Sequence, residues 1–187
     1  MISDDWIAGF VDGEGCFAIG LQLYTDSKPR KTATKSKLKK HSLGFQVVPS
    51  FRINVRHDDQ AVLEQIQQRL GVGKIYSQSR PSYARGEQTA NFYVVGLENL
   101  DVVRQFFTNT PLNSKKRHDF ELWCQCLDKI LQKRHLTKEG LLEICQIRDA
   151  MNRRESKGNR TTEKIKEILE SGREHIAAHA EPPMFST

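Results

Sequence analysis

The chain has 187 residues and a net charge of +6, and this length suffices for one domain with its own core. It contains no run of about 18 apolar residues and no segment that resembles a signal peptide, so we exclude a membrane-spanning protein and expect a soluble, intracellular one. Its four cysteines lack the spacing of metal ligands, which favours reduced structural cysteines over zinc or redox centres.

Residues 3–17 predict a helix that leads directly into a strand. Ser3 suits the N-cap position, and the apolar residues after it recur at helical spacing. These residues are Trp6, Ile7, Phe10 and Val11. Gly13 and Gly15 end the helix, and residues 16–24 continue as a strand.

This helix contains residues that normally destabilise helices. Asp12 and Glu14 lie at the negative end of the helix dipole, and Gly9 in the interior costs about 1 kcal/mol relative to Ala. Gly9 and Gly13, with Ala8 beside them, make one face small enough for a second helix to approach closely. A divalent cation would compensate a carboxylate at this end, because hard ions take oxygen ligands.

The segment over residues 25–42 carries seven basic residues and one acid, so its charge equals that of the whole chain. It lacks an apolar period, which predicts a loop or a long hairpin connection. A solvated basic loop is one interpretation, and a loop that contacts DNA phosphates is the other. Its basic residues are Lys28, Arg30, Lys31, Lys35, Lys37, Lys39 and Lys40.

Residues 43–56 alternate between apolar and polar types, which predicts a strand with Phe51, Ile53 and Val55 on one face. Pro49 indicates an irregularity or an edge position in this strand. The elements expected next are a helix over 58–70, a hairpin with strands over 74–80 and 89–95, and a helix over 97–107.

The alternation of the strands leaves one polar face on the predicted sheet. Side chains such as Gln, Asn and Arg read base edges, and a β-ribbon fits the major groove, so this face is a candidate DNA surface. An ordinary solvated sheet face is the alternative. The face comprises Ala18, Gly20, Gln22, Tyr24, Gln46, Val48, Ser50, Arg52, Asn54, Tyr76, Gln78, Asn91 and Tyr93, with Arg80 at the hairpin tip.

Helices are expected over the rest of the chain. The first follows an N-cap at Ser114 and buries Phe120, Trp123, Leu127 and Ile130. Others follow a cap at Thr137 and span residues 162–170. Lys115, Lys116 and Arg117 are cations at a helix N-terminus, where they are electrostatically misplaced, and therefore suggest an anionic partner nearby.

Residues 7–15, Ile-Ala-Gly-Phe-Val-Asp-Gly-Glu-Gly, resemble the motif of the LAGLIDADG homing endonucleases, and this motif occurs once in the chain. The resemblance implies an α+β fold with an αββαββα core, an antiparallel β saddle and additional C-terminal helices. It implies one domain over residues 1–180, with a tail over 181–187. Family members with one motif act as homodimers, which implies a dimer interface at Ala8, Gly9, Asp12 and Gly13.

The resemblance also implies an activity, namely magnesium-dependent cleavage of both strands of a long, nearly palindromic DNA target during intron homing. Glu14 and the Gly13 carbonyl would bind Mg²⁺, for which Mn²⁺ would substitute. A catalytic lysine near the scissile phosphate falls on Lys115, with Lys116 as the alternative. A basic linker over residues 153–162, with Lys157 and Arg160, would grip backbone phosphates. No small-molecule substrate and no membrane is implied.

The sequence departs from the family where single-motif members often place a glutamine near the attacking water. That position falls on Val55, which cannot orient water, and Asn54, Arg56, His57 and Gln46 are the polar candidates to replace it. Two functions without DNA cleavage stay open on this fold, an RNA maturase and a non-catalytic DNA-binding protein. A structural α/β protein whose basic loop serves only solvation is the third alternative.

Overall fold

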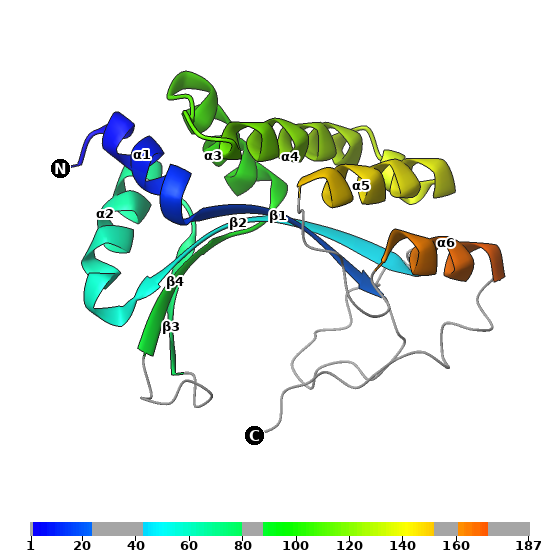
Figure 1. Ribbon diagram of the computed structural model, residues 1–187, viewed down its shortest axis with the longest axis horizontal. Coiled ribbons are helices and arrows are strands. Elements are labelled where there is room, and N and C mark those ends of the chain that lie inside the picture. Colours follow the sequence, from blue (N-terminus) through cyan, green and yellow to red (C-terminus); the bar gives the residue numbers. More distant parts are fainter. Residues whose placement is uncertain (1, 24–42, 80–87, 152–160, 172–187) are drawn as a thin grey trace. The chain divides into compact units, whose positions relative to one another are not determined.

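The computed structural model describes residues 2–23, 43–79, 88–151 and 161–171. They form the expected α+β fold, with a four-stranded antiparallel sheet in the order β1-β2-β4-β3 (Figure 1). The inner strands of this sheet are therefore β2 and β4. The elements are α1 Asp4–Glu14, β1 Gly15–Leu23, β2 Phe45–Arg56, η1 His57–Asp59, α2 Gln60–Leu70, β3 Lys74–Ser79, β4 Gln88–Val94, α3 Leu97–Asn109, α4 Lys116–Leu131, η2 Arg134–Leu136, α5 Lys138–Met151 and α6 Thr162–Ser171.

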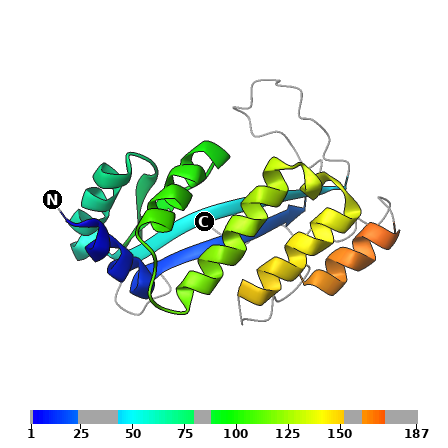
Figure 2. The ribbon, with the colours of Figure 1, turned by 90° about the horizontal axis from the view of Figure 1, so that it is seen from above.

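The chain divides into two compact units. Unit one contains residues 1–20 and 49–127, and unit two contains residues 21–48 and 128–187. Strands β1 and β2, which run side by side in Figure 2, each contribute residues to both units. The predicted basic loop, most of the predicted basic linker and the predicted tail lie outside the described residues.

The core of unit one is rich in aromatic side chains. Phe17 of β1 lies with its ring centroid 5.1 Å from that of Phe51 and 5.3 Å from that of Trp123, and it meets Phe107 edge-on at 5.8 Å. Burial of each large apolar side chain contributes about 1.5–3 kcal/mol. Phe120 completes this cluster from α4, so the expected inward faces of the strands and of α4 are confirmed.

The alternation of β2 is interrupted at Pro49. Pro49, Ser50 and Phe51 are all buried, although consecutive residues of a regular strand point to opposite faces. Because β2 is an inner strand, the edge position that Pro49 suggested is wrong, and the irregularity is confirmed. Ser50 is only 1% exposed, so its expected place on the solvent-facing polar surface is also wrong.

Unit two packs β-strand residues against the last two helices. Leu21 and Phe45 lie in one apolar cluster with Leu141 of α5 and Ile165 of α6. Cys145 is in the same cluster, and its burial raises the pKa of the thiol to about 11, so the thiol is protonated at neutral pH. The four cysteines form no disulfide bond with one another.

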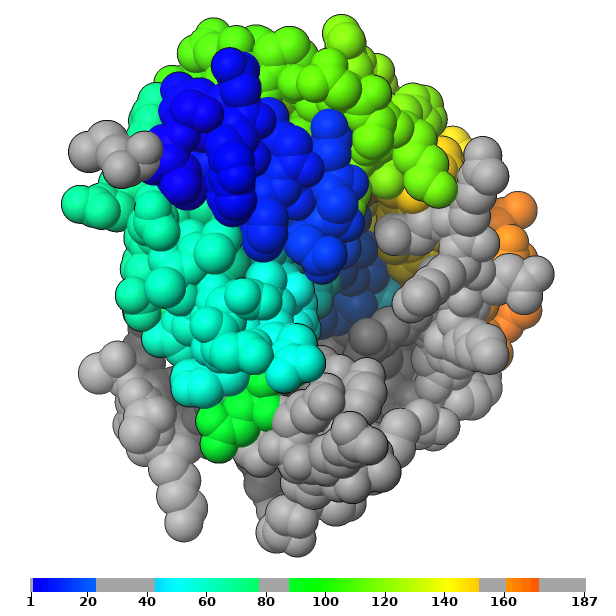
Figure 3. Space-filling view, turned by 60° about the vertical axis from the view of Figure 1, so that its left-hand side comes forward, coloured from blue at the N-terminus to red at the C-terminus, as the bar shows by residue number. Residues whose placement is uncertain are grey.

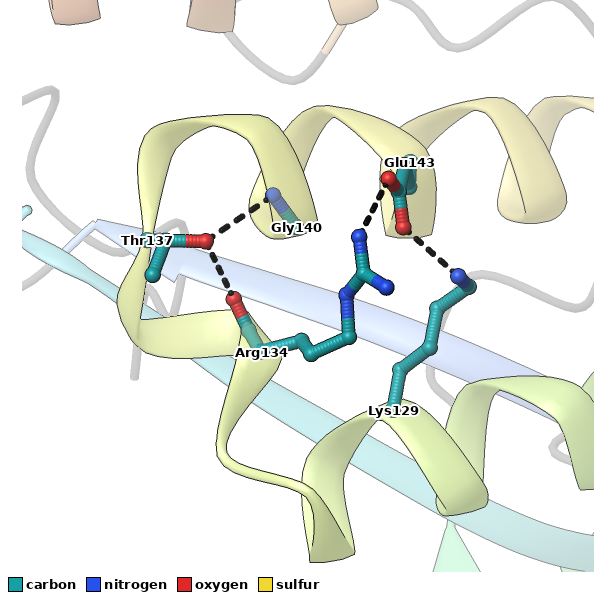
Figure 4. A network of polar contacts seen from close by, with 5 residues as sticks. All are labelled: Lys129, Arg134, Thr137, Gly140 and Glu143. Carbon is teal, nitrogen blue, oxygen red and sulfur yellow. Dashed lines mark hydrogen bonds and ion pairs between the residues drawn. The ribbon is translucent and has the colours of Figure 1, made fainter.

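Polar contacts tie α5 to the preceding segments (Figure 4). Thr137 is the predicted cap, because its Oγ1 accepts a hydrogen bond of 3.1 Å from the Gly140 N–H. A Cβ at Gly140 would lie 2.1 Å from the Arg134 carbonyl oxygen, so this close approach requires glycine. Glu143 accepts hydrogen bonds from Lys129 Nζ at 2.6 Å and from Arg134 Nη2 at 2.7 Å. The bond from Lys129 is the main cause that holds the pKa of Glu143 below its usual value.

Candidate active site and nucleic-acid interface

Glu14 is the last residue of α1 and its side chain is exposed. Ser3 caps the other end of this helix, as predicted, by accepting a hydrogen bond of 3.2 Å from the Trp6 N–H. Gly15 joins α1 directly to β1, and a Cβ there would lie 2.5 Å from Val11 Cγ1, so the tight junction requires glycine. The Glu14 carboxylate makes no hydrogen bond or ion pair with any residue that the structure describes, and is therefore available to a ligand.

Asp12 has a different role, because its carboxylate caps the N-terminal end of α4. Oδ2 accepts a hydrogen bond of 2.8 Å from the Asn113 N–H, and Oδ1 accepts bonds from the Ser114 N–H at 3.2 Å and from Ser114 Oγ at 2.7 Å. Burial opposes ionisation of Asp12, but these bonds and the nearby charge of Lys116 outweigh it and hold the pKa of Asp12 below its usual value.

Lys116 makes the reverse contact, from the start of α4 to the end of α1. Its Nζ donates hydrogen bonds to the carbonyl oxygens of Gly13, at 3.4 Å, and of Gly15. Each helix thus receives at its terminus the charge that its dipole favours, contributed by the other helix. We call these contacts of Asp12 and Lys116 the reciprocal cap.

The reciprocal cap corrects part of the electrostatic interpretation of the sequence. Asp12 and Lys116, which looked misplaced within their own helices, compensate each other's helix ends, so neither by itself requires a ligand. Lys115 is exposed, and its side chain makes no hydrogen bond or ion pair with any described residue. The structure therefore brings Lys116, the alternative candidate for the catalytic lysine, to the end of α1. It leaves Lys115 available for another partner.

One face of α1 is exposed on the surface of unit one (Figure 3, dark blue). Trp6 is 44% exposed and stacks on Phe10, with ring centroids 5.1 Å apart. Gly9 and Gly13 lie on the same face, and a Cβ at either position would meet no atom of the described residues within 4 Å. Packing among the described residues therefore does not explain these two glycines. We call Trp6, Gly9, Phe10 and Gly13 the open face of α1.

The open face differs from the interface and the buried stripe expected from the sequence. Ala8 is 2% exposed because it packs into the core of unit one, so it has no surface to offer a second helix. Asp12 is held in the reciprocal cap. Trp6 was expected on the apolar stripe with Ile7 and Val11, but only Ile7 and Val11 are fully buried.

The strand register places nine polar residues of unit one in three rows across β2, β4 and β3. Tyr93 is opposite both Arg52 and Lys74, Asn91 is opposite Asn54 and Tyr76, and Thr89 is opposite Arg56 and Gln78. The rows between them hold buried residues, such as Ile53 and Phe92. The predicted polar face therefore exists in unit one, and we call these nine residues the polar rows.

Two arginines of the polar rows have different partners. The Arg52 guanidinium carbon lies 5.7 Å from the centroid of the Tyr93 ring. Arg56 instead pairs with Asp58, donating from Nε at 3.2 Å and from Nη2 at 3.1 Å. Lys74 and Thr89 were not predicted as site residues, because only the pairing register shows that they share rows with Tyr93 and Gln78.

The other predicted site residues lie in unit two, between the polar rows or outside the described residues. Gln22 and Gln46 are exposed residues of unit two. Val55 is opposite Ala90, in a row between the polar ones, so it offers no polar group to a water. The predicted residues that lie outside the described part of the chain are Tyr24, Lys28, Arg30, Lys31, Arg80, Lys157 and Arg160.

The described residues offer neither a clustered metal site nor a membrane-spanning helix. Those residues contain no group of three or more His, Cys, Asp and Glu side chains that could hold a metal ion. None of their helices combines the length and the apolar character needed to cross a membrane.

Comparison with known proteins found one family, described as LAGLIDADG endonuclease, which matches residues 7–127. An uncharacterized 50.9 kDa protein in ND4 intron 1 of Podospora anserina is 38% identical over 138 residues, covering 72% of this chain and 26% of that protein. The probable intron-encoded endonuclease 3 of Neurospora crassa is 31% identical over 149 residues, which cover 79% of this chain and 24% of that protein. The chain thus spans about a quarter of the length of these relatives.

Solved structures of similar fold include the homing endonuclease I-TnaI, with a TM-score of 0.67 and 31% identity over 91% of this chain and 97% of that one. The LAGLIDADG meganuclease I-CpaMI, bound to uncleaved DNA, gives a TM-score of 0.70 at 27% identity, over 90% of this chain and 52% of that one. I-SmaMI, bound to uncleaved DNA in the presence of calcium ions, gives a TM-score of 0.68 at 25% identity, over 84% of this chain and 47% of that one.

Proposed function

Since this chain belongs to the LAGLIDADG endonuclease family, we propose that it is a metal-dependent endonuclease that cuts both strands of a long, nearly palindromic DNA site. The observation that carries the proposal is Glu14, an exposed carboxylate at the C-terminal end of a helix, where the dipole disfavours it. The Glu14 carboxylate makes no hydrogen bond or ion pair with any described residue, whereas the Asp12 carboxylate is bonded in the reciprocal cap. A bound cation would supply the positive charge that the Glu14 carboxylate needs as a partner.

The proposed active assembly pairs two α1 helices through their open faces. Gly9 and Gly13 allow two backbones to approach closely, and the exposed Trp6 and Phe10 would be covered by the second helix. This pairing brings two copies of Glu14 together, which one chain cannot do. We propose a homodimer, in keeping with the single motif. A covalently linked second motif would use the same face, since the chain covers about half of I-CpaMI.

The donor atoms at the end of α1 fit a divalent cation. The Glu14 carboxylate and the Gly13 carbonyl are oxygen ligands of the kind that Mg²⁺ or Mn²⁺ prefers. The Gly13 carbonyl already accepts a hydrogen bond from a cation, the ammonium group of Lys116. A bound Mg²⁺ would activate water and stabilise the attacking and leaving oxygens of an in-line displacement.

The other side chains have roles that follow from their positions. Lys116 and Asp12 hold the end of α1 against the start of α4, which fixes the backbone that carries Glu14. Lys115, one residue earlier, makes no side-chain hydrogen bond or ion pair with a described residue and would stabilise charge on the scissile phosphate. The polar rows would face the DNA grooves. One site per subunit would cut one strand, so the dimer would make a double-strand break.

A plasmid cleavage assay tests this proposal. Supercoiled DNA that carries the intron-insertion sequence is incubated with the protein, with Mg²⁺ or with a chelator. We expect linear product with Mg²⁺ only, and none from the Glu14→Gln variant, which should still bind the DNA. Glu98→Gln is the matched control, because Glu98 is also an exposed glutamate without a described partner, but lies in the first turn of α3. DNA that is bound and never cut would favour the non-catalytic DNA-binding function, and preferential binding of the intron RNA would favour the maturase.

A further inference from the structure

Arg52, an arginine of the polar rows, rests on an aromatic ring. Its guanidinium lies over Tyr93, its partner in the strand register, and it makes no hydrogen bond or ion pair with any other described residue. A contact with a ring face restricts the side chain without using its N–H groups. All five donors of the Arg52 guanidinium therefore stay available to a ligand, in a side chain that is already held in place.

Arg56 offers an internal comparison two rows away. It projects from the same strand and the same face, but Asp58 accepts hydrogen bonds from its Nε and Nη2. The carboxylate occupies one edge of this guanidinium and offsets its charge. Arg52 and Arg56 thus differ in partner, while they share residue type, strand, face and exposure.

The surroundings of Arg52 favour a base edge over a phosphate. Arg52 and Tyr93 are on β2 and β4, the two inner strands, so they lie away from the sheet edges. A sheet inserted into the major groove presents its inner strands to the base edges and its edges to the phosphates that border the groove. The polar rows contain no acidic residue, so an electron-rich base edge would not be repelled.

Resting on the proposed function, we propose that Arg52, held by Tyr93, is a specificity-determining residue that reads one guanine in each half of the DNA target. Guanine presents two acceptors, O6 and N7, in the major groove, and the planar guanidinium donates to both at once. A lysine at this position would keep the charge but lose the paired donors.

Selection from a library of randomised DNA duplexes tests the proposal. The library is bound to the full chain in the presence of a chelator, so that the DNA stays uncut, and the bound fraction is sequenced. The selected duplex is then remade with each base pair replaced in turn, and its affinity is measured for the wild type and for four variants, Arg52→Ala, Arg52→Lys, Tyr93→Leu and Arg56→Ala.

We expect the wild type to prefer guanine at one position of each half-site by about tenfold to a hundredfold. Arg52→Ala and Arg52→Lys should both lose that preference and keep those at other positions, and Tyr93→Leu should reduce it. Arg56→Ala should retain it. Because Arg52 is exposed, its variants should melt within about 2 °C of the wild type.

Three results would overturn the proposal while leaving the proposed function intact. The first is a guanine preference that survives in Arg52→Lys, which would indicate a phosphate contact. The second is a loss of the guanine preference in Arg56→Ala as large as that in Arg52→Ala. The third is a selected motif in which no position depends on guanine. Failure of the wild type to bind any duplex would instead overturn the proposed function, and this inference with it.

Discussion

Substitution of Asp12 by alanine tests whether the reciprocal cap stabilises the fold. The variant loses three hydrogen bonds to the carboxylate, two from backbone N–H groups and one from Ser114 Oγ. Hydrogen bonds to a charged group each contribute about 1.5–3 kcal/mol, but Asn113 and Ser114 are exposed and can bond to water instead. The loss should therefore resemble that of a helix cap, about 1–2 kcal/mol. For a chain of this size, that free energy lowers the melting temperature by about 2–8 °C.

The effect of Asp12→Ala should also depend on pH. The pKa of Asp12 is lowered in the folded state, because the bonds from Asn113 and Ser114 and the charge of Lys116 outweigh the effect of burial. Its contribution to stability is therefore complete above the ordinary carboxyl pKa of 3.8 and is lost as the pH falls through the lower folded-state value. The difference in unfolding free energy between wild type and variant should shrink below that pH.

Urea unfolding at pH 7 and at a series of lower pH values measures both effects. Asp5→Ala is the control, because Asp5 is an exposed acid of the same helix, and its loss should cost only a few tenths of a kcal/mol. A double-mutant cycle with Lys116→Met should give a coupling of at least about 0.5 kcal/mol if the two contacts act together. Two results would refute the stabilising role of the cap. One is a loss of unfolding free energy in Asp12→Ala no larger than that in Asp5→Ala, and the other is a wild-type-to-Asp12→Ala difference in unfolding free energy that does not change with pH.

Two further predictions concern the proposed assembly and catalysis. Gly9→Leu should convert the proposed dimer to a monomer in sedimentation experiments. It should not lower the monomer's stability, because no atom of the described residues lies within 4 Å of a Cβ at this position and Leu favours the helix by nearly 1 kcal/mol. A stable dimer of the variant would contradict the proposed interface. Lys115→Ala should slow DNA cleavage about 100-fold with little effect on melting, whereas Lys116→Ala should lower the melting temperature through loss of its contacts with α1. Equal effects of the two variants on the cleavage rate and on melting would argue against separate roles.

The local sequence was sufficient to predict the elements that depend on neighbouring residues. Ser3 and Thr137 cap their helices as expected, because a cap involves groups within three residues of it. Helices α1 and α4 and the alternation over residues 51–54 of β2 follow from periodicity in the same way. The glycine-rich end of α1 was also recognisable, since Gly15 is needed for a purely local junction.

Contacts between residues distant in the chain were decided by tertiary structure alone. Asp12 and Ser114 are about a hundred positions apart in sequence, so the compensation of their helix ends could not be read from either segment. The side of α1 that stays open depended on what covers Ala8, and the row shared by Arg52, Tyr93 and Lys74 depended on strand register. Periodicity defines which residues share a face, but long-range packing determines which face is buried and which residues of different strands become neighbours.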